Sequence, residues 1–98
     1  MMDGYRVEPG APGIEDYLRL RVAAGLSAKT HEQASAGLPN TWHGVRIVHA
    51  GSVVGMGRII GDGGTAFQIV DIALEPAHQG LGLGKAIMSA LMDHLNTH

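Results

Sequence analysis

The clearest pattern of apolar residues lies near the C-terminal end of the sequence. Apolar side chains recur there at intervals of three and four residues, which is the period of one face of an α-helix. This spacing predicts a helix from about Gly82 to Asn96. The stripe consists of Leu83, Ala86, Ile87, Ala90, Leu91 and Leu95.

Two shorter helices are expected in the first half of the chain. The segment from Ile14 to Ala24 has acidic residues in its first turn and is followed by Gly25, a typical helix stop. Thr30, followed three residues later by Gln33, fits a capping box, which predicts a second helix ending near Ala36. The predicted apolar stripe of the first helix is Ile14, Tyr17, Leu18 and Val22.

The middle of the chain has the alternation of apolar and polar residues that is typical of strands, with glycine-rich turns between the runs. These features predict an antiparallel meander and an element order β-α-α-β-β-β-α. Gly55 and Gly57 inside one strand indicate a close backbone approach or a bulge. The predicted strands are Tyr5–Val7, His43–His49, Val53–Ile60 and Thr65–Leu74.

Composition limits the functional classes. A chain of 98 residues, 45% hydrophobic and 16% charged, is expected to form a single domain over residues 1–98. The net charge of -2 argues against nucleic acid as a partner, and the absence of a long apolar run argues against a membrane. The chain has no cysteine, which excludes thiolate catalysis, and its histidines lack the spacing of a metal site. A cytoplasmic location is expected.

Three alternating glycines, Gly80, Gly82 and Gly84, lie between the last predicted strand and the last helix. A dinucleotide-binding fingerprint would need glycine where Lys85 stands, and a P-loop would need glycine at Gln79. Both motifs are therefore absent. What remains is a glycine-rich turn whose N–H groups suit an anion such as a pyrophosphate. The alternative is a plain turn between a strand and a helix.

The pattern Gln79-x-x-Gly82-x-Gly84 resembles the Q/R-x-x-G-x-G/A signature of the GCN5-related N-acetyltransferases (GNAT), in which this loop binds the pyrophosphate of coenzyme A. The preceding segment, Asp71 to Pro76, resembles the fourth strand of that family. The resemblance implies an α/β (α+β) fold with a mostly antiparallel sheet. It also implies transfer of an acetyl group from acetyl-CoA to a primary amine by direct attack, without an acyl-enzyme.

The resemblance assigns roles to particular residues. Asp71 is the candidate general base, although a structural carboxylate or a water chain are alternatives. Lys85 could add charge near a phosphate or be a solvated lysine. Acceptor contacts are expected from Leu26 to Lys29 and from Trp42, whose alternative role is packing. The implied coenzyme contacts are Ile72, Ala73, Leu74, Gln79, Gly80, Leu81, Gly82, Leu83, Gly84 and Lys85.

Domains of this family continue beyond the third helix with a fifth strand and further elements, whereas the sequence ends at His98. The family's usual proton donor to the coenzyme thiolate, a C-terminal tyrosine, has no counterpart in Tyr5 or Tyr17. Three interpretations stay open: an incomplete portion of a longer enzyme, a chain completed by a homodimer or other strand-donating partner, and a non-catalytic acyl-CoA-binding module. The acceptor, a small molecule or a protein amine, stays open as well.

Overall fold

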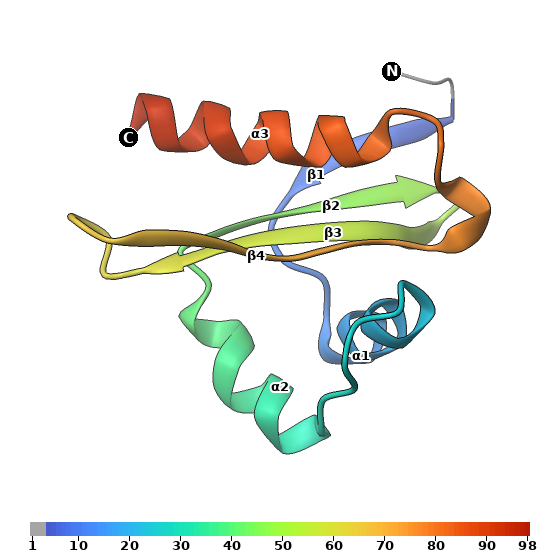
Figure 1. Cartoon of the computed structure of the whole chain (residues 1–98), viewed down its shortest axis with the longest axis horizontal. Coiled ribbons are helices and arrows are strands. Elements are labelled where there is room, and N and C mark those ends of the chain that lie inside the picture. Colours follow the sequence, from blue (N-terminus) through green and yellow to red (C-terminus); the bar gives the residue numbers. More distant parts are fainter. Residues whose placement is uncertain (1–3) are drawn as a thin grey trace.

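A four-stranded antiparallel sheet separates the helices into two groups in the computed structural model, which describes residues 4–98 (Figure 1). Helix α3 lies on one face of the sheet, and α1 and α2 lie on the other. The strands follow the order β1-β2-β3-β4, so β4 is an edge strand. The elements are β1 (Tyr5–Pro9), α1 (Ile14–Ala23), α2 (His31–Gly37), β2 (His43–His49), β3 (Ser52–Gly61), β4 (Phe67–Leu74) and α3 (Leu83–Thr97), with short 3-10 helices at Leu38–Asn40 and Pro76–His78.

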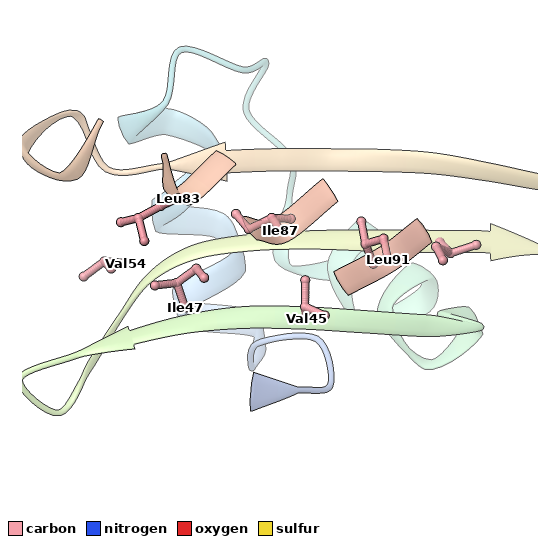
Figure 2. Packing of buried hydrophobic residues seen from close by; sticks show 7 residues of the cluster. Val45, Ile47, Val54, Leu83, Ile87 and Leu91 are labelled. Atoms are coloured by element: carbon pink, nitrogen blue, oxygen red, sulfur yellow. The ribbon is translucent and has the colours of Figure 1, made fainter. Parts of the chain in front are cut away.

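The larger apolar core lies between α3 and the sheet, and Figure 2 shows most of its side chains. The predicted helical stripe is confirmed, because its principal members Leu83, Ile87 and Leu91 are fully buried. Gly57 explains how closely α3 approaches: a Cβ there would lie 2.6 Å from Cγ2 of Ile87. The core cluster is Val45, Ile47, Val54, Ile59, Leu83, Ile87 and Leu91.

The opposite face carries a smaller core under α1 and α2, and it corrects one prediction. Val22 was expected in the apolar stripe of α1, but it is 62% exposed, whereas Leu20 is fully buried. Helix α1 is rotated so that Arg21 also faces the sheet, where it meets a carboxylate. The predicted capping box of α2 is confirmed by reciprocal hydrogen bonds between Thr30 and Gln33.

Strand β4 begins at Phe67, two residues later than the predicted Thr65. The reason is the turn before it. Oδ1 of Asp62 accepts hydrogen bonds from the N–H groups of Gly64, Thr65 and Ala66, which holds these residues in a turn. The same hydrogen bonds keep the pKa of Asp62 well below its usual range.

A β-bulge interrupts β4 in its middle. Arg58 pairs with Val70 and Met56 with Ala73, so β4 holds one more residue than β3 in this interval. Asp71 adopts a left-handed conformation there, with φ at +58°. Its side chain lies on the α1 face, and Ile72 packs against the core under α3. These two neighbouring side chains therefore lie on opposite faces of the sheet.

Candidate functional site

The glycine loop between β4 and α3 offers backbone donors without partners. Gly80 and Gly82 are left-handed, with φ at +81° and +82°, and apart from the adjoining residues no atom of residues 4–98 lies within 4 Å of a Cβ built on either. Gly82 is the N-cap of α3, and the first N–H bonded into the helix is that of Ala86, 3.1 Å from the Gly82 oxygen. The N–H groups of residues 80–85 make no hydrogen bond to any atom of residues 4–98. Because they lie at a helix N-terminus, these N–H groups favour an anion.

Most of the residues expected around the coenzyme are brought together at this end of β4. Gln79 is exposed, and its Nε2 donates a hydrogen bond to the carbonyl oxygen of Leu74 at 3.1 Å. Leu83 contributes only backbone, since its side chain is buried in the core. The Lys85 side chain is exposed in the first turn of α3. Leu81 is also exposed, so the loop presents both backbone and side chains to solvent.

The outer edge of β4 is available for pairing. The N–H of Glu75 donates to the Val54 oxygen on β3 at 2.9 Å. Since backbone groups alternate in direction along a strand, those of Leu74 and Ile72 face the free edge. The Leu74 carbonyl is the one that Gln79 binds, in agreement with this direction. An extended ligand beside β4 would therefore meet the backbone of Ile72 and Leu74.

Asp71 is the centre of a buried charged cluster. Its Oδ1 accepts a hydrogen bond from Nη1 of Arg21, and its Oδ2 accepts from Nε of Arg58 at 2.9 Å and from the hydroxyl of Tyr17 at 3.0 Å. The three charged side chains are at most 9% exposed. Burial, followed by the hydrogen bond to Asp71, raises the pKa of Tyr17. Arg21 also donates to Ser27, which connects the cluster to the loop between α1 and α2.

This cluster was only partly predicted. Asp71 was assigned a chemical role from the sequence, whereas the side chains that bind its carboxylate were not identified. The signal that could have identified Arg21 is its spacing of four residues from Tyr17, which places both on one face of α1.

A cavity of about 210 Å³ opens beside the cluster, between α1, α2 and β3. Two side chains of the cluster, Tyr17 and Arg58, belong to its wall, and Lys29 and Gln33 stand at the α2 side. Lys29 belongs to the segment from which acceptor contacts were expected, and it lines this cavity. Trp42 is not a lining residue; it packs on the apolar core beside Phe67, with ring centroids 4.6 Å apart. The cavity is lined by Tyr17, Lys29, Gln33, Ala34, Gly37, Leu38 and Arg58.

Several histidine rings stack on one another. The rings of His43 and His94 are parallel, with centroids 3.6 Å apart. Within residues 4–98, no three His, Asp or Glu side chains are grouped so that they could hold a metal ion. In the same part of the chain, no helix has both the length and the apolar character that crossing a bilayer requires.

The family is decided by a comparison with protein-family models. The model of the acetyltransferase (GNAT) family matches residues 13–98. The chain belongs to this family. The resemblance to the GCN5-related N-acetyltransferases that Gln79, Gly82 and Gly84 carry is thereby confirmed. No match was found among curated protein sequences.

Solved structures agree with this assignment. A probable acetyltransferase from Staphylococcus aureus, SA2161, is 45% identical with a TM-score of 0.90, over 95% of this chain and 70% of that protein. The ribosomal-protein-S18-alanine N-acetyltransferase of Escherichia coli is 14% identical, with a TM-score of 0.79, over 94% and 61%. Rv2747 of Mycobacterium tuberculosis, solved with CoA, is 20% identical, with a TM-score of 0.71, over 92% and 58%. The GNAT fold is confirmed, and the chain spans 58–70% of the length of these proteins.

Proposed function

We propose that the protein is an acetyl-CoA-dependent N-acetyltransferase whose glycine loop binds the coenzyme pyrophosphate. The observation that carries the proposal is the set of unpartnered N–H groups at residues 80–85, beside the open space at Gly80 and Gly82. Pyrophosphate oxygens need several donors at close range, and glycine allows that approach because it has no Cβ. Lys85 adds a positive charge at the same helix turn.

The free edge of β4 is the second feature that supports the proposal, because it suits the pantetheine arm of the coenzyme. Amides of the pantetheine arm would pair with the outward backbone groups of Ile72 and Leu74, as an added strand does. Ala73 between them is buried and holds the strand against Met56 on β3. The Leu74 carbonyl already accepts from Gln79, so its N–H is the group left for the ligand. A backbone N–H of this segment would polarise the thioester carbonyl.

The role of Asp71 as general base stays a prediction. A base must offer a lone pair to the ammonium proton, and both carboxylate oxygens already accept hydrogen bonds from cluster side chains. Its contacts support a second role, in which Asp71 holds the bulge beside the thioester and water carries the proton. The variant Asp71→Asn separates the two roles. If Asp71 is the general base, the pH dependence of kcat should be lost in the variant. If Asp71 only positions the bulge, kcat should fall while its pH profile stays unchanged.

A second candidate function, acyl-CoA binding without transfer, is favoured by the unpaired edge of β4. A strand from a second copy or another chain could occupy that edge. Release of thiol from acetyl-CoA, measured with a panel of primary amines, distinguishes the two functions. Amine-dependent release supports the transferase. Calorimetric binding of CoA without release supports the binding module, and no binding of either coenzyme form contradicts both.

A further inference from the structure

We propose that the cavity between α1, α2 and β3 binds the carboxylate of a small amino acid-like acceptor, with Lys29 and Arg58 as its cationic contacts. This inference rests on the proposed transferase function for the amine, but the anion site stands on its own geometry.

The charges around the cavity are positive. Its lining residues include Lys29 and Arg58 and no acidic side chain. Lys29 is exposed and forms no ion pair within 4.0 Å in the described part of the chain. Beneath the cavity, Asp71 balances one of the two arginines that bind it, so Arg21, Arg58 and Asp71 together keep a positive charge. An anion is the ligand that this arrangement favours.

Arg58 supplies an unused donor. Its Nε binds Asp71, and its Nη1 lies 2.7 Å from Oγ1 of Thr41 and 3.4 Å from the Gly37 oxygen. No hydrogen bond among residues 4–98 uses Nη2 of Arg58. In the same range, every buried side-chain nitrogen and oxygen has a hydrogen-bond partner. Because Nη2 has none, it must reach solvent. Arg58 is also a wall residue of this cavity. A rigid guanidinium with a free N–H pair is thus available to the cavity.

Size and donor number select a carboxylate. The cavity of about 210 Å³ is below the usual range of roughly 300–1,000 Å³ for ligand sites, so it fits the end group of a small molecule. A phosphate presents three strongly charged oxygens and needs more donors than Arg58 Nη2 and Lys29 provide. Gln33 adds its amide N–H group, since its Oε1 is held by the Thr30 N–H.

The location connects this site with the coenzyme edge. Tyr17 and Arg58 both line the cavity and both bind Asp71, and Asp71 directly precedes the segment proposed to pair with pantetheine. For transfer to follow, the amine of a molecule whose carboxylate lies in the cavity must extend toward the bulge of β4. This gives Lys29 a role in acceptor specificity.

The test is an NMR titration of the ¹⁵N-labelled protein, with and without CoA. The probes are glycine, β-alanine and 4-aminobutyrate, each compared with its amide. We expect at least one acid to shift the backbone signals of Lys29, Gln33 and Gly37, and its amide to leave them unchanged. Equal shifts from acid and amide, or no shift from any acid in either condition, would overturn the proposal. Tighter binding of phosphoethanolamine than of every acid would overturn the choice of carboxylate.

Variants of the cationic residues provide a second test, in which the affinity for the acid is measured. Lys29→Gln should weaken acid binding by about fivefold or more, as expected for a charge-assisted contact. Lys29→Arg should bind nearly as the parent does, and Arg6→Gln, which removes one positive charge from an exposed site on β1, should change nothing. Equal affinity in Lys29→Gln and the parent contradicts the role of Lys29. CoA is titrated into the same samples. If CoA does not shift the backbone signals of residues 79–85, the proposed function is rejected. The anion site is then tested only by the binding of the acids.

Discussion

Two polar regions adjoin β4, and they differ in how their hydrogen-bonding groups are used. In the cluster around Asp71, both carboxylate oxygens and nearly every arginine nitrogen have partners within the protein. In the glycine loop that follows β4, the N–H groups of residues 80–85 have none among residues 4–98. Buried polar groups must be paired for the fold to be stable, whereas exposed unpaired donors are available to a ligand. The cluster therefore stabilises the fold, and the loop is the region whose donors are available to a ligand.

The largest expected effect comes from removing the charge at the centre of the cluster. Asp71→Asn leaves two buried guanidinium groups without their counter-ion, which should lower the free energy of unfolding by about 3–5 kcal/mol. Urea denaturation measures this loss. Glu75→Gln is the control, because its carboxylate meets Arg19 at 3.1 Å nearer the surface, and the expected cost is below about 1 kcal/mol. Similar costs for both variants would contradict the distinction between cluster and surface.

The second test acts on the loop and leaves the cluster alone. Gly82→Val should weaken CoA binding by at least about tenfold, because a branched side chain would obstruct the phosphate. Gly25→Val is a matched control: its φ is +83° and its Cβ would also meet no atom within 4 Å. Both variants should lose comparable stability from backbone strain, and only Gly82→Val should lose affinity. Calorimetry and thermal unfolding measure the two effects, and an affinity loss shared by both variants would mean that strain, not phosphate access, is responsible.

A smaller effect concerns alkaline pH. The pKa of Tyr17 is raised by burial and by its hydrogen bond to Asp71. The unfolded chain therefore ionises this hydroxyl first, so its contribution to stability is present below about pH 10 and is lost as the pH rises through the folded pKa. The stability advantage of the parent over Tyr17→Phe should therefore shrink as the pH rises above about 10. A constant difference across that range would contradict the buried hydrogen bond.

The smallest expected effect is that of Lys85. Its side chain is exposed at the start of α3, so Lys85→Gln should weaken CoA binding by about two- to fivefold and leave the unfolding curve unchanged. Calorimetry at low and high salt checks this, since a charge contact weakens with ionic strength. An unchanged affinity at low salt would identify Lys85 as a solvated lysine.

The sequence predicted the loop better than the cluster for a physical reason. The glycines, the helix stripe and the Thr30–Gln33 capping box are local patterns, each carried by neighbouring residues, and the structure has them as expected. The cluster joins α1, β3 and β4, so its partners are set by packing. Arg21 faces inward because Asp71 meets it there, and Val22 is exposed for the same reason. Gly55 and Gly57 indicated a bulge or a close approach within β3, but the position of the extra residue at Asp71 depends on how β4 pairs with β3.

The most direct test compares CoA with pantetheine, which lacks the pyrophosphate and the adenosine 3′-phosphate attached to it, by calorimetric titration of the parent protein. If the unpartnered N–H groups of residues 80–85 bind the pyrophosphate, CoA should bind at least about tenfold more tightly than pantetheine. Equal affinities for the two ligands, or no binding of CoA, would contradict the claim that this loop is a coenzyme site.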